Sequence, residues 1–237
     1  MVKVLELFSG TKSIGKACDK LGWESVSVDL LLPADHECDI MDFDYKQYPK
    51  DAFDIVWGSP PCVDYSCLQS CWLGRKKADG IVYTKEIMDK NMKEADKLVL
   101  KTFEIIEYFN PHYWFLENPQ RGRLKDRDIM KDKPYYDISY CMYSDWGYEK
   151  RTRIWTNKKD WNNLICDKSG KCGNMIESRH KIVCDGGYDK RKRHRINVSK
   201  EVHTVGEKKG KVDYKDGTNK LDRYRIPEDL IFSLFLD

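Results

Sequence analysis

Residues 3–29 have the sequence KVLELFSGTKSIGKACDKLGWESVSVD, and this stretch decides the fold. Two apolar runs, Lys3 to Phe8 and Glu24 to Asp29, flank an amphipathic segment from Ser13 to Leu21. Gly22 follows that segment directly and is a common helix terminator. The stretch therefore predicts a strand, a helix and a second strand, which is the repeating unit of an α/β domain.

The same alternation continues to Thr156. A long helix is predicted from Lys90 to Phe109, where apolar residues recur every three or four positions, and a shorter one from Ile226 to Leu236. Four further strands are predicted, at Phe53 to Trp57, His112 to Glu117, Ile138 to Tyr143 and Thr152 to Thr156. Strands that alternate with helices in this way predict a mainly parallel sheet.

The composition excludes several classes of protein. The chain has 237 residues, of which 41% are hydrophobic, enough for one sizeable core with a smaller appendage. No apolar run reaches the about 18 to 20 residues that cross a bilayer, and the first residues do not resemble a secretion signal. We therefore expect a soluble intracellular protein, in a bacterial cytoplasm or an infected host cell, with no membrane partner. The nine cysteines are then thiols, metal ligands or a nucleophile.

Charge is distributed unevenly along the chain. Residues 1–146 contain 20 Lys and Arg and 25 Asp and Glu, a net charge of −5, whereas residues 147–225 contain 22 and 11, a net charge of +11. Between Trp155 and Ile226 no strand or helix period persists. A basic segment attached to a more acidic domain indicates a surface that binds a polyanion, although a solvated basic loop region fits the charge alone equally well.

A cysteine follows one of the predicted strands. Residues 54–62 have the sequence DIVWGSPPC, in which two prolines stiffen the turn that presents Cys62. Ligands of α/β sheets bind at the carboxyl ends of the strands, so this thiol is in the place of a nucleophile. A buried structural cysteine after a proline turn is the alternative. A second strand ends in Glu117-Asn118, which predicts a carboxylate at the same edge.

The first strand runs into Phe8-Ser9-Gly10, a turn of small residues that opens a helix. Asp29 ends the next strand, where doubly wound folds place an acid that holds ribose hydroxyls. Lys12 stands where a dinucleotide fingerprint has its second glycine, so S-adenosylmethionine is favoured over nicotinamide and flavin cofactors.

In order and spacing these motifs resemble those of the DNA cytosine-5 methyltransferase family over residues 2–157. The short phage and large-virus members are the most similar, because Trp146-Gly147 precedes and Ile154 to Asn157 follows two arginines. The resemblance implies a Rossmann-like mixed sheet that binds S-adenosylmethionine and carries a small basic insert. It also implies methyl transfer to carbon 5 of cytosine in DNA, through a covalent adduct of Cys62 with Glu117 assisting at the base.

The resemblance assigns further roles residue by residue. Asn118 would hold the base beside Glu117, Arg151 and Arg153 would form the family's late arginine motif, and Ser66 would contact the target phosphate. The implied cofactor contacts are Phe8, Ser9, Gly10, Asp29, Asp39, Ile40 and Pro60.

The resemblance also predicts the domains. Residues 1–156 with 222–237 would form the catalytic domain, residues 157–221 the target-recognition region, and residues 65–91 a mobile catalytic loop. The chain departs from the family pattern at Val63 and Glu149, where glutamines are usual, and it lacks the late Gly-Asn motif.

Within the basic region Cys166, Cys172, His180 and Cys184 are residue types that bind zinc, and a structural zinc ion would stabilise a small loop-rich module. Reduced thiols that bind no metal are the alternative.

Two other functions remain open from the sequence. The family includes a branch that methylates tRNA, and a polyanion-binding surface does not distinguish RNA from DNA. A catalytically silent DNA-binding protein with the same fold is the second alternative.

Overall fold

The computed structural model describes residues 1–76, 79–176, 179–180, 200–202, 212–214 and 224–236. The chain divides into two compact units. Unit 1 contains Met1–Asp137 and Arg151–Asn163, and unit 2 contains Ile138–Lys150 and Leu164–Asp237. Among the described residues, no helix is both long and apolar enough to cross a membrane.

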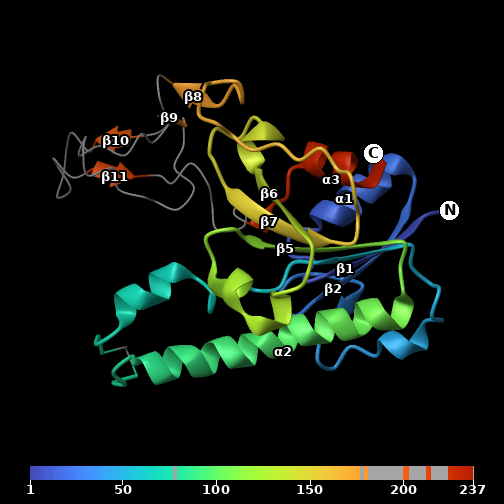
Figure 1. The fold of residues 1–237 in the computed structure, drawn as a ribbon, viewed down its shortest axis with the longest axis horizontal. Coiled ribbons are helices and arrows are strands. Elements are labelled where there is room, and N and C mark those ends of the chain that lie inside the picture. The colour runs from blue at the N-terminus through green and yellow to red at the C-terminus, as the bar shows by residue number, and fades with distance from the viewer. Residues whose placement is uncertain (77–78, 177–178, 181–199, 203–211, 215–223, 237) are drawn as a thin grey trace. The chain divides into compact units, whose positions relative to one another are not determined.

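The main sheet has seven strands in the order β3-β2-β1-β4-β5-β7-β6 (Figure 1). The first five strands in this order pair in parallel, and β7 runs antiparallel to β5. The predicted mixed α/β sheet is thereby confirmed. The strands are β1 (Lys3–Leu7), β2 (Glu24–Asp29), β3 (His36–Glu37), β4 (Ile55–Gly58), β5 (Tyr113–Pro119), β6 (Tyr135–Ser139) and β7 (Arg151–Thr156).

Two helices of unit 1 cover opposite faces of this sheet. Helix α1 (Ser13–Leu21) connects β1 to β2, and α2 (Lys85–Phe109) connects β4 to β5. The step from β1 to β2 and the step from β4 to β5 run in opposite directions along the sheet. Two right-handed crossovers therefore place the two helices on opposite faces. The gap between the carboxyl ends of β1 and β4 is the topological switch point, where open α/β sheets bind their ligands.

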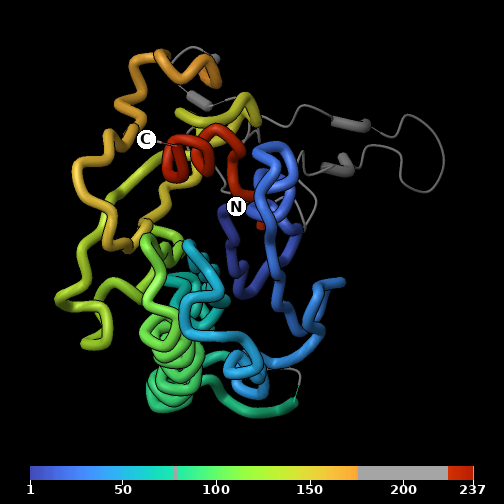
Figure 2. The backbone as a smooth tube through the Cα atoms, turned by 90° about the vertical axis from the view of Figure 1, so that its right-hand side faces the viewer, coloured from blue at the N-terminus to red at the C-terminus, as the bar shows by residue number. Residues whose placement is uncertain are grey.

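Helix α2 is five residues longer at its start than the sequence predicts. Thr84 caps it by accepting a hydrogen bond from the Ile87 amide at 3.3 Å, and Met88 and Met92 extend the buried stripe toward the amino end. Figure 2 gives the view along this helix. The predicted loop over residues 65–91 was therefore wrong for its last seven residues, about two helical turns, because charged residues between Ile87, Met88 and Met92 weaken the apolar period there.

The remaining elements are short. The predicted strand Ile138 to Tyr143 was wrong: β6 begins earlier, and a 3₁₀ turn follows it, closed by the Tyr143 amide on the Tyr140 carbonyl at 2.9 Å. The predicted terminal helix is present as α3 in unit 2. The short elements are η1 (Tyr45–Gln47), η2 (Cys67–Trp72), η3 (Arg123–Asp126), η4 (Asp128–Met130), η5 (Tyr140–Met142), β8 (Met175–Ile176), β9 (Arg179–His180), β10 (Lys200–Val202), β11 (Val212–Tyr214) and α3 (Glu228–Leu236).

Gly58 lets α2 pack directly on the end of β4. A Cβ atom at this position would lie 2.8 Å from Cγ2 of Thr102, a buried residue of α2. We predict that Gly58→Ala lowers the free energy of unfolding by about 1 to 3 kcal/mol through overpacking. Urea denaturation measures this loss.

Thr102→Ser supplies the matched test, because it removes Cγ2 and keeps the hydroxyl that donates to the Leu98 carbonyl at 2.9 Å. The double variant should recover part of the Gly58→Ala loss. Losses that simply add would show that this contact is not the cause.

Candidate active site

The predicted chemical residues lie along one edge of the sheet. Each follows or ends a strand of the parallel set, so the parallel direction brings them to the same edge. In strand order they are Asp39 and Ile40 after β3, Asp29 on β2, Phe8 to Gly10 after β1, Pro60 and Cys62 after β4, and Glu117 and Asn118 on β5. Strand β7, which is antiparallel, begins at this edge with Arg151.

The turn before Cys62 is attached to both neighbouring strands. The Ser59 amide donates to the Leu7 carbonyl of β1 at 3.2 Å, and the Asn118 side-chain amide of β5 donates to the Pro60 carbonyl at 2.9 Å. The second bond is buried. Cys62 itself is half-buried, so its thiol sits on a fixed turn that a ligand can still reach.

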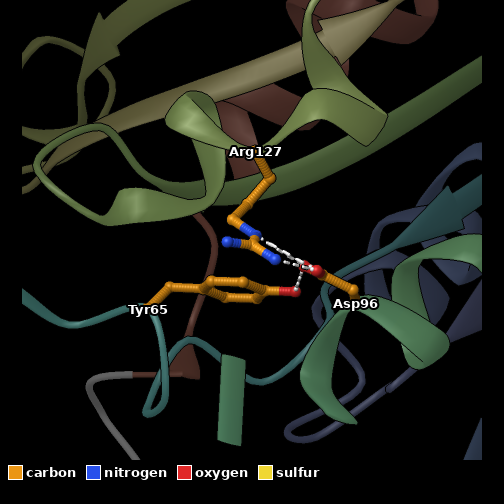
Figure 3. A network of polar contacts seen from close by, with 3 residues as sticks. All are labelled: Tyr65, Asp96 and Arg127. Carbon is orange, nitrogen blue, oxygen red and sulfur yellow. Dashed lines mark hydrogen bonds and ion pairs between the residues drawn. The ribbon is translucent and has the colours of Figure 1, made fainter. Parts of the chain in front are cut away.

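A buried polar network holds the chain three residues after Cys62 (Figure 3). The hydroxyl of Tyr65, which is fully buried, donates to Asp96 of α2 at 3.0 Å. Arg127 donates to both oxygens of the same carboxylate, with its Nε at 3.1 and 3.0 Å. The Arg123 amide also donates to the Tyr65 carbonyl at 2.7 Å. Cys62 therefore lies between two anchored points, Pro60 and Tyr65.

Glu117 and Asn118 are both buried at the end of β5. The Oδ1 atom of Asn118 has no hydrogen-bond partner among the described residues, although its amide group holds Pro60. Gly122 lies against this oxygen, since a Cβ atom there would lie 3.5 Å from it and 3.0 Å from the Pro119 carbonyl. A buried acceptor without a partner indicates a ligand or water that supplies a donor.

The turn after β1 is also shaped for a ligand. Phe8, Gly10 and Lys12 all have positive φ angles, and the Gly10 amide donates to Asp29 Oδ2 at 2.8 Å. The other oxygen of Asp29 accepts from the Leu31 and Leu32 amides, each at 2.8 Å. A carboxylate has about four acceptor positions, so Asp29 keeps capacity for one more donor.

Ser9 lies in the same turn. Its side chain is buried, and its hydroxyl has no partner among the described residues. An unsatisfied polar group at this point fits a turn that completes its hydrogen bonds with a bound molecule.

Glu6, which sequence reasoning missed, caps α1 from within the sheet. Its carboxylate accepts from the Ile14 amide at 3.1 Å and from the Gly15 amide at 3.0 Å, which are the first-turn donors of α1. Nucleotide-binding folds present such donors to phosphate. Because Glu6 occupies both amides, they are not available to a phosphate group. An acid inside an apolar strand was the signal in the sequence.

Three other predicted residues serve the structure locally. Ile40 is part of the hydrophobic core, and Asp39 accepts from the Met41 amide at 2.9 Å. Ser66 caps η2 by accepting from the Leu68 amide at 3.2 Å.

The two arginines of β7 differ in their surroundings. Arg153 forms a two-point ion pair with Asp137, with nitrogen to oxygen distances of 2.7 and 2.8 Å, and its guanidinium lies 3.6 Å from the centre of the Tyr135 ring. The Arg151 carbonyl accepts from the Gln120 amide at 3.1 Å, which places Arg151 beyond the end of β5. Arg151 is thus nearer in register to the catalytic edge, and Arg153 lies opposite Asn118.

The four predicted zinc ligands are only partly described. In unit 2 Cys166 and Cys172 lie together with Cys141, a residue that sequence reasoning missed. The side chain of His180 and the whole of Cys184 lie outside the described residues.

Comparison with known proteins identifies relatives. A family model for C-5 cytosine-specific DNA methylase matches residues 31–132. A protein of Frog virus 3 (isolate Goorha) named "Probable DNA (cytosine-5)-methyltransferase" is 34% identical over 241 residues, covering 98% of both chains.

Solved structures resemble the chain more distantly. The Entamoeba histolytica methyltransferase EhMeth is 16% identical, with a TM-score of 0.46, over 70% of this chain and 56% of that one. The S. pombe Dnmt2 methyltransferase is 14% identical, with a TM-score of 0.42, over 68% and 52%. The match thus spans about half the length of these solved chains.

The buried Glu6 gives the protein a specific pH dependence. Burial raises the pKa of Glu6 to about 7, and the hydrogen bonds from Ile14 and Gly15 offset this only in part. The folded state therefore holds the Glu6 proton up to pH 7, whereas the unfolded chain releases it near pH 4.5. Stability due to this group falls as the pH rises through that window, by about 3 kcal/mol in total, and then levels off.

Urea denaturation between pH 4 and 8 measures this effect, and Glu6→Gln is the control because it cannot titrate. As the pH rises, we expect the unfolding free energy of the unmodified protein to decline relative to that of the variant. Parallel pH profiles of the two proteins would contradict the assignment.

The Tyr65 network predicts how firmly the Cys62 turn is held. Tyr65→Phe removes the hydroxyl bond to Asp96, a loss of about 1 kcal/mol that should raise the alkylation rate of Cys62 about fivefold. Mass spectrometry of the modified peptide measures that rate. Tyr108→Phe is the matched control, since Tyr108 also donates one hydroxyl bond, at 3.0 Å to the Tyr48 carbonyl. Equal rates in both variants would show that the network does not hold the turn.

Proposed function

The chain belongs to the C-5 cytosine-specific DNA methylase family, and from that premise we propose that Cys62 is the nucleophile of methyl transfer to cytosine in DNA. One observation carries this proposal. The Cys62 turn is hydrogen-bonded through Pro60 to Asn118, the neighbour of Glu117 on the adjacent strand. A thiol and a carboxyl group are thereby kept at the same edge of the sheet. The proposed reaction requires this, because both groups must contact one cytosine ring.

S-adenosylmethionine would be held by the edge beside these residues. The open acceptor position of Asp29 fits a ribose hydroxyl, and the buried Ser9 hydroxyl offers one further bond. The cofactor has no phosphate, which agrees with the capping of α1 by Glu6. When bound, the sulfonium supplies the methyl group. Phe8, Gly10, Asp39, Ile40 and Pro60 complete the proposed cofactor set.

The protein groups have distinct roles in the proposed reaction. Carbon 5 of cytosine is a weak nucleophile until the Cys62 thiolate bonds to carbon 6. Glu117 shares a proton with ring nitrogen 3, so the electron pair released by addition becomes available at carbon 5. Carbon 5 would then be the atom that accepts the methyl group from bound S-adenosylmethionine, which would leave as S-adenosylhomocysteine. Loss of the carbon 5 proton to a base and release of the Cys62 thiolate restore the aromatic ring.

Asn118 is proposed to read the base. Its buried Oδ1 has no hydrogen-bond partner among the described residues, and the exocyclic amine of cytosine would supply the missing donor. Arg151 and Ser66 are proposed to hold the target phosphate, and Arg153 to keep Arg151 and β7 in register through its pair with Asp137. The target cytosine would have to leave the duplex to reach this edge.

The basic region 157–221 is proposed as the target-recognition segment, with residues 1–156 and 222–237 as the catalytic part. Its lysines and arginines would bind the phosphate backbone, which gives affinity that falls as salt rises. That region lies mostly outside the described residues, so its support comes from the charge of the sequence.

The predicted outcome is that unmethylated duplex DNA, incubated with methyl-labelled S-adenosylmethionine, yields labelled 5-methylcytosine after digestion and mass spectrometry. Cys62→Ser should lower the rate at least about a thousandfold and leave cofactor binding intact, because only the nucleophile is lost. Cys67→Ser, five residues on and exposed, is the matched control and should keep full activity.

DNA that contains 5-fluorocytosine tests the covalent step directly. Fluorine at carbon 5 leaves no proton to remove, so the Cys62 adduct should persist on a denaturing gel. Label that enters tRNA and not DNA would show that tRNA is the substrate. Absence of cofactor binding would favour a silent DNA-binding protein. Turnover by Cys62→Ser would exclude the covalent route.

A further inference from the structure

Three cysteines of unit 2 bring their sulfur atoms together. The Sγ atoms of Cys141, Cys166 and Cys172 all lie within 4.8 Å of one another. Cys141 and Cys166 are buried, and Cys172 is half-buried. The three residues come from two separate segments of the unit, Ile138–Lys150 and the chain after Leu164.

We propose that Cys141, Cys166 and Cys172 form a structural site for a thiophilic divalent metal ion, with zinc as the expected occupant. Each thiol would lose its proton to solvent as its sulfur bonds to the metal. The site differs from the sequence-based prediction, because Cys141 joins Cys166 and Cys172 from an earlier segment. It does not depend on the proposed methyl transfer.

The sulfur positions suit such an ion closely. Zinc binds thiolates at about 2.3 Å in tetrahedral geometry, which places the sulfur atoms about 3.8 Å apart. The observed limit of 4.8 Å requires the sulfurs to approach by no more than about 1 Å, a change that side-chain rotation supplies. Three ligands leave one tetrahedral position, and among the described side chains no fourth His, Cys, Asp or Glu joins the cluster.

The backbone around the cluster is already ordered by Asn174. This buried side chain donates to the carbonyls of Cys141 at 2.8 Å and Cys172 at 2.9 Å, and it accepts from the Gly147 amide at 2.8 Å. The Cys166 amide donates to the Ser139 hydroxyl at 3.2 Å. The three ligands are therefore held in place by bonds that do not involve sulfur, which lowers the ordering cost of metal binding.

A metal here would join the two segments of unit 2. In sequence they are separated by β7, which belongs to unit 1, so local pairing alone does not hold them together. Small loop-rich modules commonly gain their stability from such a crosslink. We therefore expect the ion to stabilise unit 2, with no part in the chemistry at Cys62.

The test uses the full chain, purified under reducing conditions without chelator. Elemental analysis should find about one zinc per chain. After removal by chelator, titration with Co²⁺ should produce tetrahedral d–d bands and thiolate-to-metal charge-transfer absorption. Cys141→Ser, Cys166→Ser and Cys172→Ser should each weaken or abolish these signals. Cys67→Ser, Cys71→Ser and Cys62→Ser should retain them.

A second measurement covers variants that fail to fold. In the unmodified protein, alkylation of Cys141, Cys166 and Cys172 should accelerate when chelator removes the metal, whereas alkylation of Cys67 and Cys71 should not change. Protein without stoichiometric metal and without thiolate–cobalt absorption would overturn the proposal. A disulfide between any two of the three cysteines, found by mass spectrometry under non-reducing conditions, would overturn it too.

Discussion

The position of β1 between β2 and β4 is the constraint on which the rest of unit 1 depends. Because β1 pairs in parallel with both β2 and β4, the turns that follow these three strands all lie at the same edge of the sheet. The proposed cofactor turn after β1 and the cysteine turn after β4 become neighbours for that reason. A reversal of either strand would carry its chemical residue to the opposite edge.

Hydrogen bonds to three carboxyl groups then hold the turns and loops at this edge of the sheet. Glu6 binds the start of α1, Asp29 binds the turn at Gly10, and Asp96 binds Tyr65 and Arg127. Asp96 is buried, and an unpaired charge there would be costly, so its carboxylate holds Tyr65 and Arg127 strongly. Rigid turns suit the proposed methyl transfer, in which the thiol, the cytosine ring and the methyl donor must be aligned within a small angle.

The sequence predicts those features whose signals are local. The unit β1–α1–β2 follows from adjacent residues, and Cys62 and Glu117 stand out because each ends an apolar strand. The Asp96–Arg127 pair was not predictable in this way, since its members are 31 residues apart and meet only through packing. Cys141 was missed for the same reason. Helix α2 begins earlier than predicted because charged residues interrupt the apolar pattern of its first two turns.

The anchors on either side of Cys62 have a consequence for sequence variation. Val63, where the family usually has glutamine, is exposed, and its neighbours use only its carbonyl: the Ser66 amide at 3.2 Å and the Gln69 side chain at 3.0 Å. A backbone acceptor is supplied equally by any residue. Substitution beside Cys62 is therefore structurally inexpensive, and related chains are free to diversify this position without losing the geometry of the thiol.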